Sequence, residues 1–125
     1  MSLATALAGK RVIICCGSGG VGKTTISASV ALEHALAGKR TVVCTIDPAR
    51  RLANSLGLDR LDNEPRPVPS DAFAAAELDA NGGELHALML DTKRTFDALV
   101  ERYAPSAEIR ESVLRNRMYQ NISSA

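Results

Sequence analysis

Nine residues near the start of the chain carry its clearest chemistry. Positions 17–25 read GSGGVGKTT and contain the pattern Gly, four free positions, Gly, Lys and Ser or Thr. Glycines let successive backbone N–H groups turn toward one anion, and a helix that follows adds the positive end of its dipole. The pattern predicts a site for the phosphates of a nucleoside triphosphate, formed by Gly17, Ser18, Gly19, Gly20, Val21, Gly22, Lys23, Thr24 and Thr25.

Two side chains of this loop have predicted roles of their own. The ammonium group of Lys23 is a mobile point charge that can reach the β- and γ-phosphates, so Lys23 is a catalytic as well as a binding candidate. The hydroxyl of Thr24 is placed to ligate Mg²⁺, which prefers oxygen ligands. The loop is therefore expected to hold a nucleotide together with its metal ion.

A second group of candidates follows an apolar run at 41–46. Asp47 has two open roles. It can cap a helix over residues 48–56, with Pro48 at the first helical position, or its carboxylate can orient an attacking water and reach the Mg²⁺ shell. Arg50 and Arg51 belong either to a solvated helix face or to the groups that neutralise transferred phosphoryl charge.

The elements that must position these residues are legible from the pattern. Apolar and β-branched residues 11–16 predict a strand that enters the loop, and residues 24–36 predict a helix that ends at Gly38. Residues 41–46 predict a strand buried on both faces, as in a parallel sheet. A right-handed crossover brings the loop and Asp47 to the same sheet edge, so the expected fold is an α/β P-loop NTPase type with a parallel sheet and flanking helices.

The later segments predict organisation rather than chemistry. Residues 58–70 form a loop, residues 73–78 a possible strand, and residues 84–90 a strand that ends at Asp91. Asp91 is either a metal-shell carboxylate or a helix cap. Helices are expected at 93–103 and 106–119.

Composition limits the class of protein. With 125 residues and 46% hydrophobic content, the chain is at most one domain. Its net charge is +1 and its basic residues are scattered, which argues against a nucleic-acid partner. The first eight residues are too short for a signal-peptide core, and no apolar run approaches a membrane span. A cytoplasmic protein is expected, one that reaches a membrane only through a partner.

The loop together with TIDPARRLANSLG at 45–57, and the stretch at 83–97, resembles the arsenite-pump ATPase family, which includes the ATPases that deliver tail-anchored membrane proteins. The resemblance implies ATP and Mg²⁺ as cofactors, phosphate and Mg²⁺ held by Lys23 and Thr24, and water oriented by Asp47. It also implies a homodimer with nucleotide near the subunit interface. Hydrolysis would be coupled to anion efflux through a membrane channel or to delivery of a hydrophobic client protein.

The sequence departs from that family at two places. The family has a lysine at the second position of the loop, where this chain has Ser18, and Arg50 or Arg51 is our hypothesis for the replacement charge. A DTAPTGH-like strand that ends in Asp does not occur in these residues. Residues 1–125 are therefore predicted to be the N-terminal part of one P-loop ATPase domain, incomplete at the C-terminus, in which residues from about 92 to 125 begin a helical client-binding subdomain.

Two other classes stay open. One is a nucleotide-dependent scaffold or regulator related to the partition and septum-positioning ATPases, which have a similar loop. A lipid-binding amphipathic tail would favour it, and none is visible in the sequence. The other is a small-molecule kinase, which the segment at 45–57 disfavours by resemblance alone.

Overall fold

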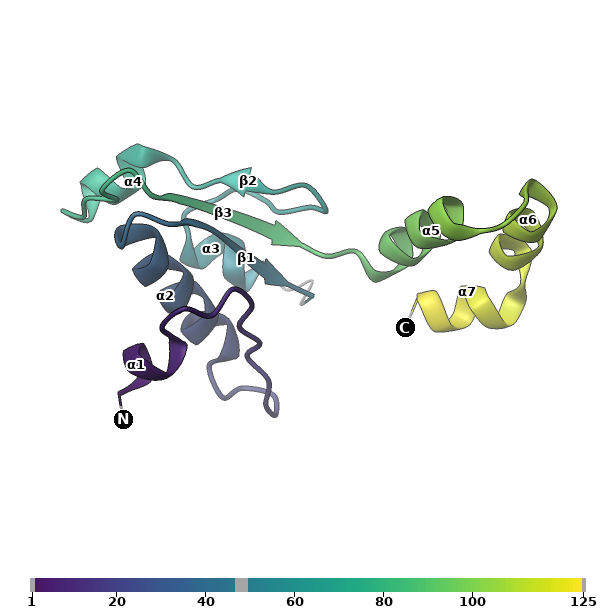
Figure 1. Cartoon of the computed structure of the whole chain (residues 1–125), viewed down its shortest axis with the longest axis horizontal. Coiled ribbons are helices and arrows are strands. Elements are labelled where there is room, and N and C mark those ends of the chain that lie inside the picture. The colour runs from purple at the N-terminus through teal and green to yellow at the C-terminus, as the bar shows by residue number, and fades with distance from the viewer. Residues whose placement is uncertain (1, 47–49, 125) are drawn as a thin grey trace.

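The computed structural model describes residues 2–46 and 50–124 as a small sheet with helices packed against it, followed by a separate group of three helices (Figure 1). Strand β3 pairs in parallel with β1 and antiparallel with β2, in the order β1-β3-β2. The α/β class is confirmed, although the short strand β2 makes the sheet mixed. In chain order the elements are α1 Leu3–Leu7, α2 Lys23–Leu36, β1 Arg40–Thr45, α3 Arg51–Ser55, β2 Arg66–Pro67, α4 Ser70–Ala75, β3 Glu84–Met89, α5 Thr92–Tyr103, α6 Ala107–Arg115 and α7 Arg117–Ser123.

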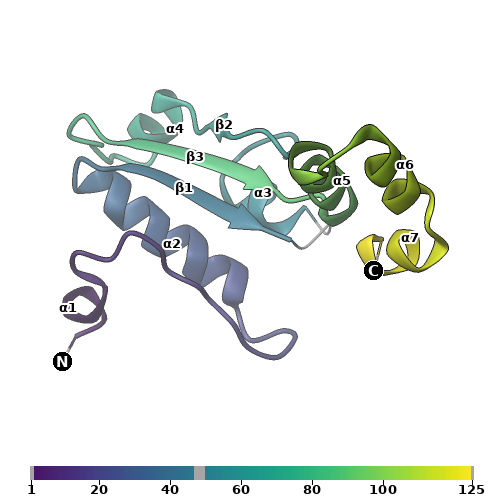
Figure 2. The same cartoon turned by 45° about the vertical axis from the view of Figure 1, so that its right-hand side comes forward.

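Helix α2 lies along one face of the sheet, and small side chains make the approach close (Figure 2). Ala35 has 0% exposure, and the helix ends as predicted at Gly38, whose φ of 80° is a left-handed conformation that favours glycine. The buried core gathers small and apolar residues from α2, the sheet, α3 and α4: Ala28, Ala31, Ala35, Val43, Leu52, Ala53, Leu61, Phe73, Leu85 and Ala87.

The prediction that residues 41–46 are buried on both faces is wrong. Val43 is buried, whereas Val42 on the opposite face is 54% exposed. Successive side chains of a strand point to opposite faces, and the core helices pack on the face of Val43. Within the described residues, the face of Val42 is therefore open to solvent.

The predicted strand at 11–16 does not form. These residues are extended but belong to no strand of the described sheet, and Val12 and Ile14 are 79% and 82% exposed. A strand needs a neighbour that accepts and donates backbone hydrogen bonds. Residues 11–16 pair with none of the described strands, although β1 is an edge strand with one free side, so the apolar pattern alone does not create the element.

Two further expectations are corrected. Residues 73–78 are not a strand, because Ser70–Ala75 forms helix α4, whose single buried anchor is Phe73. The helix expected at 106–119 is two helices, because Asn116 leaves the helical conformation and its side chain accepts from the backbone N–H groups of Met118 and Tyr119 at 2.9 and 3.1 Å. An asparagine that caps a helix in this way ends the preceding one.

Helices α5, α6 and α7 pack on one another and stand apart from the sheet (Figures 1 and 2). A network of polar side chains connects α5 with α7. Lys93 Nζ lies 2.5 and 2.6 Å from the two carboxylate oxygens of Asp97, and the Tyr119 hydroxyl donates to Asp97 at 2.8 Å. The ammonium group of Lys93 also lies 5.4 Å from the centre of the Tyr119 ring.

This network makes the helical group sensitive to pH at both extremes. The hydrogen bonds from Lys93 and Tyr119 lower the pKa of Asp97, so its contribution to stability is present above the ordinary Asp pKa and is lost as pH falls through the lowered value. Burial and the bond to Asp97 raise the pKa of Tyr119 to about 12, so the contribution of the neutral phenol is lost as pH rises through that value.

We expect the pKa of Tyr119 to fall when Asp97 loses its charge. The chain has two tyrosines, so a Tyr103→Phe background leaves the ultraviolet absorbance of tyrosinate to report Tyr119 alone. In that background the midpoint should lie near 12 and should fall in the Asp97→Asn variant, while staying above the ordinary tyrosine pKa because burial, the larger cause, remains. An unchanged midpoint would mean that the carboxylate does not hold the phenol.

The junction between β3 and α5 is held by three consecutive backbone N–H groups. Met89 donates to the Asp62 carbonyl at 2.9 Å, Leu90 to the Thr45 carbonyl at 2.8 Å, and Asp91 to the Asn63 side-chain oxygen at 2.5 Å. The amide nitrogen of Asn63 also donates to Thr95 Oγ1 at 3.4 Å. The segment that follows α3 is therefore bonded directly to the start of the helical group.

Removing this bridge should loosen α5. The Asn63→Ala variant removes the acceptor of the Asp91 N–H and the donor to Thr95 Oγ1, which still donates to the Asp91 carbonyl. We therefore expect a loss of about 1–2 kcal/mol in the free energy of unfolding. Hydrogen exchange at Asp91 should also accelerate. Asn54→Ala, an exposed site on α3, is the matched control and should leave both measurements nearly unchanged.

Gly83 sits where α2 and the start of β3 come closest. A Cβ at this position would lie 1.9 Å from the carbonyl oxygen of Ala35 and 3.0 Å from that of Ala80. Both are backbone atoms, so relief requires the helix and strand to move apart. The Gly83→Ala variant should lose about 1–3 kcal/mol in denaturant unfolding, whereas Gly19→Ala, with nothing within 4 Å of its Cβ position, should not.

Candidate phosphate-binding site

The glycine-rich loop lies at the N-terminal end of α2, on the side of the sheet where β1 and β3 end (Figures 1 and 2). Gly20 and Gly22 have φ values of 74° and 89°, in the left-handed region that a side chain disfavours. Gly22 is the residue that precedes the helix. The two glycines explain why this loop turns directly into α2.

The start of α2 offers donors to an anion. The Ile26 N–H donates to the Gly22 carbonyl at 3.0 Å. The three N–H groups before it belong to the first turn, where a helix leaves its donors unsatisfied. Those groups belong to Lys23, Thr24 and Thr25. Together with the helix dipole they suit a phosphate group.

Lys23 lies across the loop. Its Nζ donates to the backbone carbonyl of Ser18 at 2.6 Å. An ammonium group has three donors, so two remain for phosphate oxygens while this bond persists. Ser18, which stands where the resembling family has a lysine, thus contributes its carbonyl to holding Lys23.

The residues present fit Mg²⁺ as well. Thr24 is half-buried in the first turn of α2, beside an exposed loop. Mg²⁺ takes one or two protein oxygens and fills its remaining positions with water and nucleotide phosphates. A single hydroxyl next to a phosphate cradle satisfies that requirement.

The second group of candidates is only partly described. Asp47 lies outside the described residues, so its side chain is not placed. Arg50 and Arg51 are exposed, and helix α3 spans Arg51–Ser55. Pro48, the predicted first helical position, lies outside the described residues. Arg50 adopts a φ of 52°, which is uncommon for a residue with a side chain.

Asp91 has the role of a cap. Its side chain accepts from the Arg94 N–H at 2.9 Å at the start of α5. A carboxylate there satisfies one of the free donors of the first turn. Of the two roles left open by the sequence, the structure shows this one.

A cavity at the sheet edge is lined by Arg50 and Arg60, whereas the sequence predicted a role for Arg50 or Arg51. This cavity, of about 170 Å³, is lined by Arg50 and Arg60 together with Thr45, Leu52, Ala53, Leu61 and Met89, and Arg51 is not among its lining residues. Sequence reasoning missed Arg60, because a lone arginine in a loop carries no motif and only folding brings it beside Arg50.

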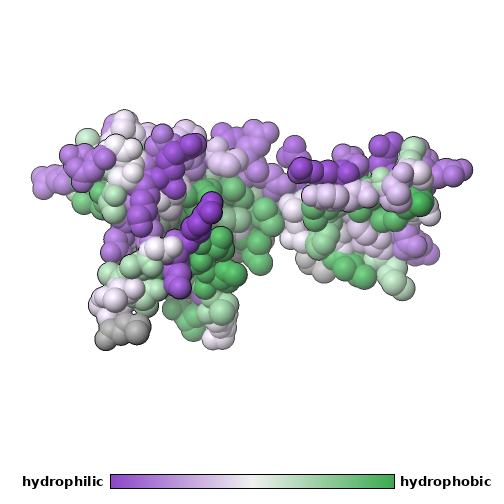
Figure 3. Space-filling model, viewed as in Figure 1, coloured by the Kyte–Doolittle hydropathy of each residue, from purple (hydrophilic) through white to green (hydrophobic). Residues whose placement is uncertain are grey.

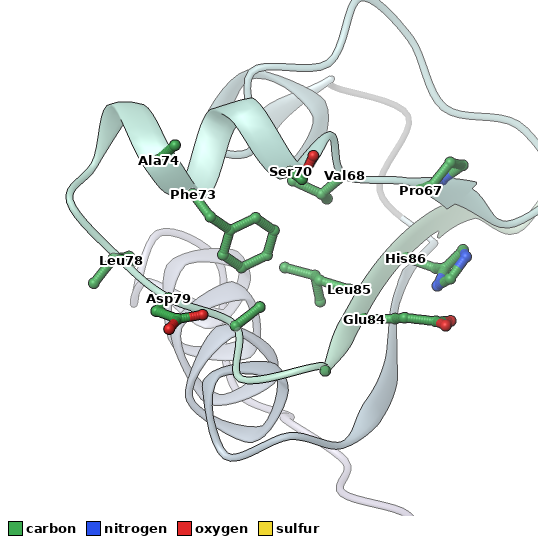
Figure 4. A pocket seen from close by; sticks show the side chains of 12 residues that line it. Pro67, Val68, Ser70, Phe73, Ala74, Leu78, Asp79, Glu84, Leu85 and His86 are labelled. Carbon is green, nitrogen blue, oxygen red and sulfur yellow. The ribbon is translucent and has the colours of Figure 1, made fainter.

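A larger cavity, of about 630 Å³, lies elsewhere (Figure 4). Phe73 and Leu85 point into it, and its lining includes the carboxylates of Asp79 and Glu84. It borders the beginning of β3, near the C-terminal end of α2, and so lies about 20 Å from the loop along the helix. Carboxylates repel phosphate, so size alone does not identify the phosphate site.

Comparisons with known proteins point the same way. The family model described as anion-transporting ATPase matches residues 10–118. The ATPase ASNA1 homolog of Plasmodium falciparum (isolate 3D7) is 32% identical over 85 residues, which are 67% of this chain and 22% of that protein. The chain therefore spans about a fifth of the length of this relative. In the described part of the chain, no helix is both long enough and apolar enough to cross a membrane.

Proposed function

Because the chain belongs to the anion-transporting ATPase family, we propose that the protein of which it forms part binds ATP and Mg²⁺ at residues 17–25 and couples hydrolysis to movement of a cargo. One observation carries this proposal. Gly20 and Gly22, which have positive φ values, and the ammonium group of Lys23 lie around the first turn of α2, where backbone N–H groups lack helical acceptors. Such an arrangement suits the phosphates of a nucleotide.

Each residue has a defined part in the proposed reaction. The N–H groups of the loop and of the first turn of α2 hold the phosphates, and Lys23 neutralises charge that develops on them. Thr24 contributes a hydroxyl to the Mg²⁺ ion, which when bound offsets phosphate charge. Asp47 orients the water and takes its proton.

The proposed domain is larger than this chain. Residues 1–125 form the N-terminal part of one P-loop ATPase domain, and residues from about 92 onward begin its client-binding subdomain. The protein acts as a homodimer. Arg50 or Arg51 supplies the charge that the family's loop lysine supplies elsewhere, because both follow Asp47 closely in sequence.

A hydrophobic client is the cargo that the helical group supports best. Apolar side chains remain exposed on all three helices, and Figure 3 shows hydrophobic surface on this part of the molecule. Surfaces of this kind often mark contacts with other apolar segments. The large exposed residues are Phe96, Leu99, Tyr103, Ile109, Met118 and Ile122.

Anion efflux is the second candidate cargo function, supported by the description of the matching family. It would require a membrane channel as partner. A nucleotide-dependent scaffold of the partition type is the remaining alternative, and it would use the same loop to control assembly.

The test is phosphate release from Mg²⁺-ATP by the full-length protein, measured alone, with an apolar helical peptide of about 20 residues, and with an oxyanion. Stimulation and peptide binding together would support client delivery. Stimulation by the oxyanion alone would support efflux. Nucleotide binding that drives assembly without turnover would favour the scaffold and would contradict the proposed ATPase.

A further inference from the structure

The cavity beside Arg50 and Arg60 lies where the two parallel strands end. Thr45 is the last residue of β1 and Met89 the last of β3, and both line it. In open α/β sheets the carboxyl ends of the strands are where ligands bind. Its floor is apolar and buried, since Leu52, Ala53 and Leu61 are 2%, 1% and 8% exposed.

The charged side chains that line this cavity in the described part of the chain are all basic. Arg50 and Arg60 are the charged residues among the lining residues that the structure describes, and neither forms an ion pair with any residue in the ranges 2–46 and 50–124. Asp62, two residues after Arg60, forms its ion pair with Arg66 at 2.5 Å and interacts with Arg60 only through longer-range electrostatics. Two guanidinium groups therefore meet an apolar floor without a carboxylate in the lining.

Backbone conformation adds a second, independent observation. Arg50 holds a φ of 52°, a conformation that costs energy in a residue with a side chain and that clusters at functional sites. Asn54 N–H donates to the Arg50 carbonyl at 3.0 Å, so α3 fixes the backbone at this point. The unfavourable conformation is thus maintained where it presents a cation to the cavity.

The volume of the cavity indicates the size of the ligand that it can hold. About 170 Å³ corresponds to roughly five or six water volumes, and a tetrahedral oxyanion has five heavy atoms. Guanidinium groups bind such oxygens through paired hydrogen bonds. We propose that this cavity is a binding site for one tetrahedral oxyanion of the size of phosphate, held by Arg50 and Arg60.

Two sources could supply that oxyanion. One is the terminal phosphate of a nucleotide held in the loop, since both sites lie on the same side of the sheet. The other is a free oxyanion from solution. Oxyanion binding at this site does not require ATP hydrolysis, so the experiment that tests it can fail or succeed independently of the ATPase test.

The test is calorimetric titration of the full-length protein with inorganic phosphate, at constant ionic strength and without nucleotide. We expect binding by the unaltered protein and by Lys23→Ala, and a loss of at least about tenfold in affinity in Arg60→Gln and in Arg50→Gln. Arg102→Gln, on α5, is the matched control and should bind as the unaltered protein does. Thermal unfolding of each variant confirms that the fold is retained.

Repeating the titration with saturating Mg²⁺-ATP identifies the source. Phosphate binding that is abolished by the nucleotide assigns the cavity to the terminal phosphate, and unchanged binding assigns it to an oxyanion from solution. The proposal is overturned if the unaltered protein binds no phosphate. It is also overturned if binding survives in Arg60→Gln and disappears in Lys23→Ala, because the anion would then occupy the loop.

Discussion

Replacing Lys23 by alanine should weaken the binding of Mg²⁺-ATP by about a hundredfold or more. The bond from Nζ to the Ser18 carbonyl shows that the side chain lies over the loop, where its remaining donors can reach phosphate. A charge-assisted hydrogen bond contributes about 1.5–3 kcal/mol, and each 1.4 kcal/mol is a factor of ten in affinity. Titration calorimetry on the full-length protein measures the effect.

The control is Lys39→Ala, which removes the same charge from an exposed site at the other end of α2. It should bind the nucleotide as the unaltered protein does. Thermal unfolding without nucleotide distinguishes a lost contact from a disordered loop. Equal affinity in both variants would mean that the loop is not the phosphate site.

The parts of the fold with local signals could be predicted from sequence. The loop, α2 and its end at Gly38 follow from glycines whose positive φ values are needed where they stand. Helix α5 was expected over 93–103 and forms one residue earlier, at Thr92, because Asp91 caps it. In each case one residue determines the boundary through its own backbone or side chain.

The parts that depend on distant partners could not be predicted in this way. Residues 11–16 have a strand pattern, yet strand formation needs pairing with a neighbouring strand, and these residues pair with none of the described strands. Residues 70–75 form a helix because Phe73 finds a buried place beside Leu85, and this contact has no periodic signal over so few residues. Packing overrides local propensity in such short segments.

The candidate site shows the same division. Its phosphate loop is a contiguous motif, so it could be proposed from nine neighbouring residues. The pairing of Arg50 with Arg60 arises because α3 and the segment after it return to the end of β3, where the Met89 N–H bonds the Asp62 carbonyl. Because this arrangement depends on how the chain folds back, the spacing of the two arginines in the sequence does not predict it.

Replacing Asp47 by asparagine should lower kcat for ATP hydrolysis by about a hundredfold or more, because a positioned base contributes about 10²–10⁴ to the rate. Affinity for Mg²⁺-ATP should not weaken, since the loop supplies the phosphate contacts. Asn keeps the size of the side chain and its ability to accept a hydrogen bond, so the variant removes only the charge of the carboxylate. Single-turnover phosphate release, with nucleotide affinity measured in parallel, reports each quantity.

The matched control is Asp91→Asn, because Asp91 also follows a strand closely and caps a helix. If its carboxylate serves only as a cap for α5, the asparagine should preserve both stability and hydrolysis. A large loss of kcat in Asp91→Asn together with normal turnover in Asp47→Asn would reverse the assignment and move the catalytic carboxylate to the end of β3. A loss in Asp47→Asn alone would support Asp47 as the base, since the two variants differ in which carboxylate is removed.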